Sequence, residues 1–398
     1  MERKATGPLA GVRILDLTTV MMGPSATQYL AELGADVIKV EAPAGDPIRG
    51  IAPGRHPEMG GLFMNANTGK RSIVLDLKHG PARDALLRLA ESADVLVYNI
   101  RPQAMARLGL SYEDVAAHRP DIIYAGLFGF GQDGPYAAQP AYDDLIQGAS
   151  LIPWLMHKAG AAMPRYMPSA IADRVVGLAA VSAINAALYH REKTGEGQRI
   201  DVPMFETMVG FVIADHLGGL TFDPPLDQGG YPRLLALQRK PYKTSDGYVC
   251  ALVYNDKQWR AFYEAVGEGD AFATDPRLAS MNTRNQHIDE LYGEVAARFA
   301  TRTTADWMEL LKAADIPVMP YHGLDTIFDD PHLKAIGFFA EDEHPTEGRI
   351  RRVRAAGTWS KTQPGHVRHA PRKGADTESI LHEAGLDKAA IAAATKAG

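Results

Sequence analysis

The chain has 398 residues, of which 46% are hydrophobic and 23% charged, values ordinary for a soluble globular protein. This length exceeds one typical hydrophobic core and predicts two domains. The formal net charge of −6 gives no overall basic field, so neither nucleic acid nor an acidic membrane is expected as a partner. The single cysteine, Cys250, excludes an internal disulfide framework, and no secretory signal or long apolar run is present, which predicts a cytoplasmic protein.

Strand and helix signals alternate over the first 130 residues. Buried strands are expected at 12–17, 36–41, 72–77, 95–98 and 122–125, and helices at 23–33 and 81–91. Nearly continuous apolar strands joined by helices are typical of a parallel sheet that is covered on both faces. The expected fold class is therefore α/β, with a doubly wound parallel-sheet large domain.

The second half of the chain predicts a smaller domain. A long helix is expected from Asp173 to His190, a strand at 200–202 and a helix at 205–217, before a segment rich in Pro and Gly. A hairpin near 245–247 and helices near 257–266, 286–300 and 304–314 indicate a small α+β domain. The expected boundaries are 1–220 for the large domain, 221–239 for a linker, 240–320 for the small domain and 321–398 for a return to the large domain, as loops with a final Ala-rich helix.

Several short motifs fail in their context. Gly129 to Gly134 fits G-x-G-x-x-G, but Pro135 follows at once and no helix of the dinucleotide-binding type opens there. The phosphate-loop pattern before Lys70 fails because Met64 stands where a glycine is required. The 13 histidines include no metal-binding spacing, so no metal site is expected.

Two aspartates begin helical stretches. Asp173 opens the long apolar helix, where a first-turn or capping role is the simplest interpretation. A helix N-terminus also stabilises a reactive carboxylate, so a chemical role is compatible with that position. Asp143 follows Tyr142 in a turn and, taken alone, is also an ordinary capping residue.

An ordered series of motifs runs along nearly the whole chain and resembles one enzyme family. The motifs include LDLTTV at 15–20, LGADVIKVE at 33–41, NTGKRSIVLDLK at 67–78, ADVLVYN at 93–99 and KTGEGQ at 193–198. Each is weak alone, but their order resembles that of the family III CoA-transferases, of the formyl-CoA transferase and carnitine–bile-acid CoA-transferase type. The resemblance implies a large CoA-binding domain, a small domain and an interlocked homodimer.

The resemblance also implies the roles of individual residues. Asp173 corresponds to the nucleophile, and Tyr142 and Asp143 are the further catalytic candidates. The segments that contact CoA in the family map to Val20, Met21, Leu75, Asp76, Leu77, Lys78, Asn99, Ile100, Arg101 and Arg107. Lys78, Arg101 and Arg107 suit the CoA phosphates, and Lys39, Lys70 and Arg71 are weaker candidates.

The implied reaction moves CoA from an acyl-CoA thioester to a free carboxylic acid. Asp173 would form an acyl-aspartyl anhydride and then an aspartyl-CoA thioester. An ionised aspartate suffices for these steps, so no metal or redox cofactor is expected, and CoA enters as the substrate thioester. The expected partners are therefore an acyl-CoA, a carboxylic acid and a second copy of the chain.

The sequence departs from the family pattern at several positions, which leaves alternatives for the acyl substrates and for the function. Met21 stands where formyl-CoA transferase has glutamine, and Ala42 where it has an arginine, so the acyl pair need not be formyl and oxalyl. The related α-methylacyl-CoA racemases carry His-Asp at Tyr142-Asp143, which makes a racemase the second reading. A non-catalytic CoA-binding protein is the third reading, and the intact Asp173 argues against it. Asp143 is expected either to help position the acyl group or to cap the helix that follows.

Overall fold

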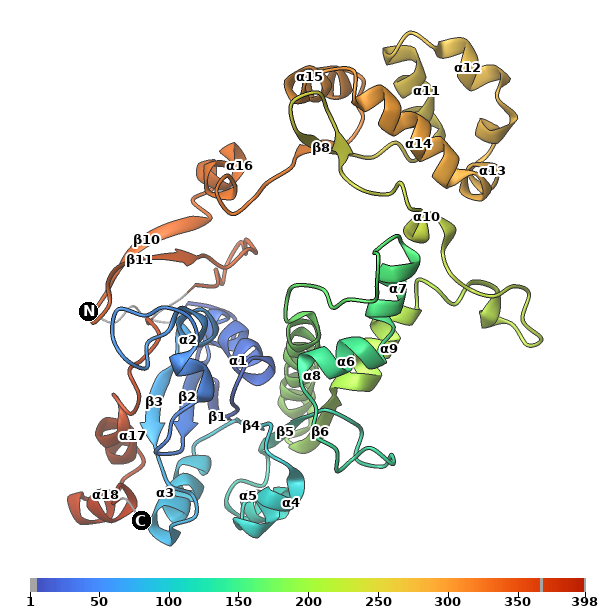
Figure 1. The fold of residues 1–398 in the computed structure, drawn as a ribbon. Helices are drawn as coiled ribbons and strands as arrows, with labels where there is room; N and C mark the ends of the chain where they lie inside the picture. The colour runs from blue at the N-terminus through green and yellow to red at the C-terminus, as the bar shows by residue number, and fades with distance from the viewer. Residues whose placement is uncertain (1–5, 366–367, 397–398) are drawn as a thin grey trace. The chain divides into compact units, whose positions relative to one another are not determined.

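The computed structural model describes residues 6–365 and 368–396 and divides into two compact units (Figure 1). The first unit comprises Met1–Ser150, Met167–Phe211 and His332–Gly398, and the second comprises Leu151–Tyr166 and Val212–Pro331. The boundaries differ from the expected ones because α7 (Ile152–Lys158) contacts α10 (Pro232–Leu235) in the second unit. Sequence patterns do not report that contact, since some 75 residues separate the two helices.

A parallel sheet of six strands forms the centre of the first unit. The strands lie in the order β3-β2-β1-β4-β5-β6, and every neighbouring pair is parallel. They are β1 (Arg13–Leu17), β2 (Asp36–Glu41), β3 (Arg71–Val74), β4 (Val95–Tyr98), β5 (Ile123–Phe128) and β6 (Gln198–Pro203). This order is that of a doubly wound sheet, in which the winding reverses between β1 and β4. The predicted α/β class with a parallel sheet is confirmed.

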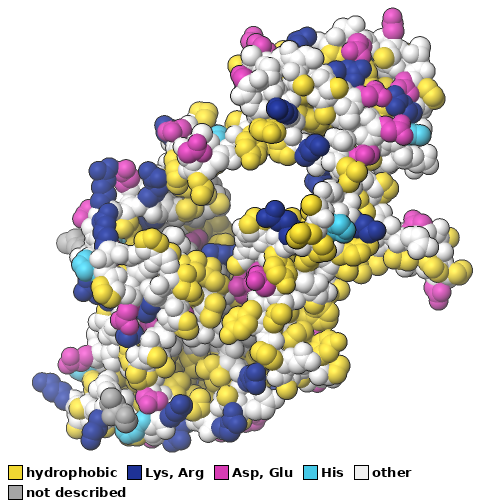
Figure 2. Space-filling view, viewed as in Figure 1, with side chains coloured by type: hydrophobic (Ala, Val, Ile, Leu, Met, Phe, Trp, Pro, Cys, Tyr) yellow, Lys and Arg dark blue, Asp and Glu magenta, His cyan; other side chains and the backbone are white. Residues whose placement is uncertain are grey.

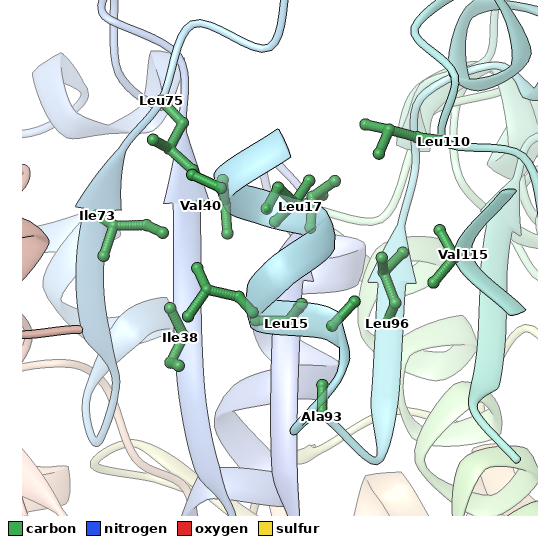
Figure 3. Close-up of a cluster of buried hydrophobic side chains, with 14 of the residues drawn as sticks. Leu15, Leu17, Ile38, Val40, Ile73, Leu75, Ala93, Leu96, Leu110 and Val115 are labelled. Carbon is green, nitrogen blue, oxygen red and sulfur yellow. The ribbon is translucent and has the colours of Figure 1, made fainter. Parts of the chain in front are cut away.

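Helices cover both faces of this sheet, as its nearly continuous apolar strands require. On one face, Leu15, Ile38 and Leu96 pack with α3 (Gly80–Ala90), α5 (Tyr112–His118), α17 (Thr377–Glu383) and α18 (Lys388–Ala394) (Figure 3). On the other face, α1 (Met22–Glu32) packs against α8 (Ile171–Thr194) and contacts β1 and β2. The first unit also contains α2 (Gly61–Asn67), α4 (Pro102–Arg107), α6 (Asp143–Ala149) and a 3-10 helix at Pro47–Gly50.

The C-terminal segment has more structure than the sequence suggested. A hairpin of β10 (Phe339–His344) and β11 (Gly348–Val353) precedes the two final helices. Its strands are rich in charged residues rather than apolar ones, so the hydrophobic pattern gave little sign of them. Cross-strand ion pairs compensate, since Arg352 Nε lies 2.9 Å from Asp342 Oδ2 and Arg349 also pairs with Glu341.

The second unit has its own aromatic core. Phe299 and Trp307 stack with ring centroids 4.3 Å apart, and Trp259 and Phe262 are buried with them. The sheet has the order β7-β8-β9, and its expected hairpin turns at 244–247. Its elements are β7 (Tyr242–Lys243), β8 (Tyr248–Ala251), α11 (Asp256–Ala265), α12 (Gly269–Thr274), α13 (Met281–Gln286), α14 (Ile288–Phe299), α15 (Thr304–Ala313) and β9 (Val318–Pro320), with α9 (Met204–Ile213) and α16 (Pro331–Ala335) at the boundaries with the first unit.

Candidate active site

A cavity of about 290 Å³ opens in the first unit at the carboxyl ends of its central strands. Residues that follow β1, β4 and β6 line it, together with the end of β5 and the loop before α6. Ligands of open α/β sheets bind outside the carboxyl ends of the strands, where the winding reverses. Six predicted site residues meet in this cavity: Val20, Met21, Asn99, Arg101, Tyr142 and Asp173.

Asp173 lies in the first turn of α8 and lines the cavity. It does not cap its own helix, because the N-cap position of α8 is Ala170, three residues earlier. Within the described chain, nothing donates a hydrogen bond to its carboxylate. The pKa of Asp173 is raised to about 7, because burial and the nearby charge of Asp143 raise it by more than Arg174 lowers it. The cavity therefore contains a basic, unpaired carboxylate.

The side chain of Asp143 contacts the backbone of Asp173. Its Oδ1 accepts the backbone N–H of Asp173 at 3.0 Å, and its Oδ2 accepts a hydrogen bond from Gln147 Nε2 at 2.6 Å. Asp143 thus caps α8, 30 residues further along the chain, rather than its own helix. The prediction that Asp143 caps the helix that follows it is therefore wrong, and its expected role in positioning the acyl group stays a prediction. Tyr142 precedes α6, lines the cavity and is 66% exposed.

The loop after β1 has a conformation that the surrounding structure enforces. Val20 has φ of +70°, in the left-handed region that a β-branched residue rarely adopts. Asp46 Oδ1 accepts the N–H of Val20 at 3.2 Å. Asn99 accepts the N–H of Thr19 at 3.1 Å and donates to its carbonyl at 2.9 Å. The Asn99 side chain therefore fixes the backbone at Thr19, which lines the cavity. Its sequence motif did not indicate this role.

The three weaker phosphate candidates are engaged inside the protein. Lys39 is fully buried, and its Nζ lies 2.8 Å from Asp46 Oδ2. Lys70 is also buried and pairs with Asp16 at 2.9 Å, and burial lowers the pKa of Lys70 to about 8. Arg71 forms ion pairs with Asp36 and Glu383. Their nitrogens are not available to a CoA phosphate, so the prediction for them is wrong.

The three stronger candidates remain accessible. Lys78, Arg101 and Arg107 are exposed, and within the described residues none of them takes part in an ion pair. Lys78 follows β3 and Arg101 follows β4. Because β3 and β4 are three strand spacings apart, a ligand that reaches both cations spans about 14 Å along the carboxyl edge of the sheet.

The remaining predicted contacts lie around this edge. The Leu75 side chain is 1% exposed and packs in the core with Val40 and Ile73, so only its backbone is available to a ligand (Figure 3). Leu77 and Ile100 pack partly against the same core, and the Asp76 Oδ1 accepts the N–H of Lys78 at 3.2 Å. None of these side chains lines the cavity beside Asp173.

Comparison with known proteins identifies the family. The family model described as CoA-transferase family III matches residues 9–377. The chain belongs to CoA-transferase family III. It is 33% identical to the succinate–glutarate CoA-transferase of Agrobacterium fabrum, over 94% of this chain and 95% of that protein. It is 31% identical to the succinyl-CoA:mesaconate CoA-transferase of Haloarcula marismortui, over 96% of this chain and 97% of that protein.

Solved structures agree with this family. A crystal structure of a CAIB/BAIF family protein from Brucella suis matches with a TM-score of 0.80 and 30% sequence identity, over 95% of this chain and 100% of that chain. The predicted family and enzyme class are thereby confirmed: the chain is an acyl-CoA:carboxylate CoA-transferase.

Two further features of this transferase concern metals and membranes. Among the described residues, no group of three or more His, Cys, Asp or Glu side chains could hold a metal ion.

In the same residues, α8 is the one helix long and apolar enough to cross a membrane. Such a composition is weak evidence, because core helices share it, and α8 packs on α1, β5 and β6. The absence of a membrane partner stays a prediction.

Sequence reasoning missed how Gln147 and Asp46 serve this site. Gln147 was not among the predicted site residues, although Asp143 and Gln147 are four residues apart, a spacing at which helical side chains meet. That spacing was the available signal. For Asp46 no local signal existed, since its partners Lys39 and Val20 come from other elements.

Proposed function

We propose that this transferase uses Asp173 as its nucleophile, with Asp143 and Tyr142 completing the catalytic site. The observation that carries the proposal is the state of the Asp173 carboxylate, which lines the cavity, is largely buried and has no hydrogen-bond partner among the described residues. A carboxylate with a raised pKa is a stronger base and a better nucleophile than an ordinary aspartate, provided that it is ionised. Its position in the first turn of α8 favours the ionised form.

The reaction proceeds by four acyl transfers. An Asp173 oxygen attacks the thioester carbonyl, which forms a mixed anhydride and releases CoA thiolate. The thiolate attacks the aspartyl carbonyl of the anhydride, which forms an aspartyl-CoA thioester and releases the donor acid. The acceptor carboxylate attacks that thioester, which forms a second anhydride and again releases the thiolate. The thiolate then attacks the acceptor's acyl carbon, which yields the new acyl-CoA and restores Asp173.

CoA lies along the carboxyl edge of the sheet in this proposal. Lys78, Arg101 and Arg107 supply the cations for its phosphates, and the loop at Val20 and Met21 holds the end of the molecule that carries the thioester. The separation of about 14 Å between the ends of β3 and β4, with a cation at each end, suits an extended ligand that carries more than one anionic group. No metal or bound cofactor has a step in this scheme, and the reaction is assigned to the cytoplasm.

Trapping with hydroxylamine tests the proposed nucleophile. Hydroxylamine added during turnover is expected to convert the anhydride or aspartyl thioester into a hydroxamate on the peptide that contains Asp173, detected by mass spectrometry. Asp173→Asn is expected to abolish both the adduct and turnover. Turnover by Asp173→Asn near the wild-type rate, or an adduct on another carboxylate, would exclude Asp173.

The acyl pair is sought first among dicarboxylic acids. The two relatives compared above are named for succinate with glutarate and for succinyl-CoA with mesaconate. A panel that starts with succinyl-CoA and these acceptors, and extends to monocarboxylic and fatty acids, is read by mass spectrometry of the CoA esters. The pair with the highest kcat/KM identifies the physiological class.

The active enzyme is proposed to be a homodimer. Leu178 and Tyr189 of α8 and Phe211 of α9 are 51%, 66% and 59% exposed, and Figure 2 displays hydrophobic side chains on the surface of the first unit. Exposed apolar patches of this kind mark protein interfaces. Light scattering at micromolar concentration is expected to give twice the mass of the 43.1 kDa chain, and a monomer mass would contradict the proposal.

A further inference from the structure

Gln147 is a buried side chain whose amide forms hydrogen bonds through both its nitrogen and its oxygen. It lies one turn after Asp143 on α6 and has no exposed surface. Its Nε2 donates to Asp143 Oδ2 at 2.6 Å and to the Ser169 carbonyl at 3.1 Å. Its Oε1 accepts the N–H of Met167 at 2.9 Å. The amide thus joins α6 to the segment that leads into α8.

The contacts determine which way the amide faces. A primary amide has two N–H donors, and those of Gln147 are used by the Asp143 carboxylate and the Ser169 carbonyl. The opposite orientation would place its oxygen against those two acceptors and its NH₂ against the Met167 N–H. Only the observed orientation pairs every group.

These hydrogen bonds connect Gln147 to Asp173. Asp143 accepts from Gln147 with one carboxylate oxygen and from the Asp173 backbone N–H with the other. Ser169 then accepts the N–H of Ile171, the first residue of α8. Gln147 therefore acts on Asp173 by two routes, through the Asp143 carboxylate and through the entry to α8.

We propose that Gln147 is a positioning residue of the transferase, which holds the Asp143 carboxylate against the Asp173 backbone and thereby sets the protonation and placement of the nucleophile. The proposal rests on the function proposed for Asp173. Without Gln147, the Asp143 carboxylate loses its shortest hydrogen bond and is no longer held against the Asp173 backbone. When the Asp143 carboxylate moves away, the negative charge beside Asp173 is reduced and the pKa of Asp173 falls.

Few other charged side chains affect the Asp173 carboxylate. Arg174 lies beside it on α8, and Arg101 and Tyr142 line the same cavity. The first turn of α1, which packs on α8, has no charged side chain, and neither does β5; on β6, Arg199 pairs with Asp201 at 3.1 Å. Asp144, also on α6, is exposed, so among the described residues Asp143 is the acidic group that acts on the pKa of Asp173 and contacts Gln147.

The test uses Gln147→Met, which keeps the volume and removes the amide. Two readouts are followed against pH: kcat/KM, and the rate at which a water-soluble carbodiimide labels Asp173 in the resting enzyme, measured by peptide mass spectrometry. We expect the midpoint of both profiles to fall by about one pH unit. We also expect kcat to fall between about 10- and 100-fold with little change in KM for the acyl-CoA.

Two further variants separate positioning from stability. Ser150→Ala removes a buried hydroxyl that donates only to the Gln147 carbonyl, at 3.5 Å, so it should affect stability while both midpoints and kcat stay at wild-type values. In the double variant with Asp143→Asn, the midpoint should equal that of Asp143→Asn alone, because the effect of Gln147 on the charge beside Asp173 passes through the Asp143 carboxylate. If Gln147→Met does not fold, Gln147→Asn, whose amide is one methylene shorter, replaces it.

The outcomes distinguish the two proposals. A Gln147→Met enzyme that unfolds earlier but retains wild-type midpoints and kcat would make Gln147 purely structural and overturn this inference. If Asp173→Asn still turns over, the nucleophile assignment itself has failed. A midpoint shift in the labelling profile would then still support the contact between Gln147 and Asp173, since labelling does not depend on turnover.

Discussion

Replacing Asp173 by asparagine should stabilise this enzyme while inactivating it, and the gain should grow with pH. The pKa of Asp173 is raised from 3.8 to about 7 in the folded protein. The folded state therefore binds this proton more tightly than the unfolded state does. Any stability linked to the proton is fully present below about pH 4 and is lost as the pH rises through 7. Asparagine does not titrate and avoids that loss.

The size of the effect follows from the shift. A displacement of about three pKa units corresponds to about 4 kcal/mol at high pH, at about 1.36 kcal/mol per unit. This is an upper figure, because the cavity admits water to part of the carboxyl group. Between pH 5.5 and 8.5, the stability difference between Asp173→Asn and the wild type should increase by about 2 kcal/mol.

Urea unfolding at these two pH values measures the difference, at one protein concentration so that any subunit association is equal. Hydrogen exchange of the α8 amides gives a local measure, which is useful because two units need not unfold together. Asp144→Asn is the matched control, since Asp144 is exposed on the same turn of α6 as Asp143. An Asp173→Asn gain that is the same at both pH values would refute the reasoning.

Three other predictions follow from the site. Asp143→Asn should move the acid limb of the kcat/KM profile to lower pH and reduce turnover, because it removes the charge that raises the pKa of Asp173; an unchanged profile would count against its role. Arg101→Ala should raise KM for the acyl-CoA about tenfold with kcat nearly unchanged, as expected for a lost charge-assisted phosphate contact, measured by steady-state kinetics. Asp46→Asn should lower stability by about 3 kcal/mol in urea unfolding, because Lys39 is left buried without its partner.

A deuterium experiment separates the transferase from the racemase alternative. Incubation of the enzyme with an α-methylacyl-CoA in deuterated water should leave the α-carbon free of deuterium, because acyl transfer never ionises that carbon. Mass spectrometry of the recovered ester gives the result. Deuterium incorporated at a rate comparable with CoA transfer would restore the racemase reading.

The amino-acid sequence alone determined the elements that rest on local patterns. The limits of β2 and β4 agree with the predicted strands at 36–41 and 95–98, because short runs rich in Val, Ile and Leu and bounded by turn residues predict buried strands. The start of α8 near Asp173 was predicted because a long apolar helical pattern begins there. The family was predicted from the order of the motifs along the chain. The hairpin of β10 and β11 was not predicted, because its strands are stabilised by ion pairs rather than by an apolar face.

Only the tertiary structure decided what the polar residues do. Lys70 and Asp16 are 54 residues apart, and Asp143 meets the Asp173 backbone across 30 residues. A local pattern records the type of a side chain but not the partner that the fold brings to it. Whether a lysine binds phosphate or fills a buried ion pair, and whether an aspartate caps its own helix or another, depends on that partner. The parallel sheet supplies these partners by bringing the ends of distant strands to one edge.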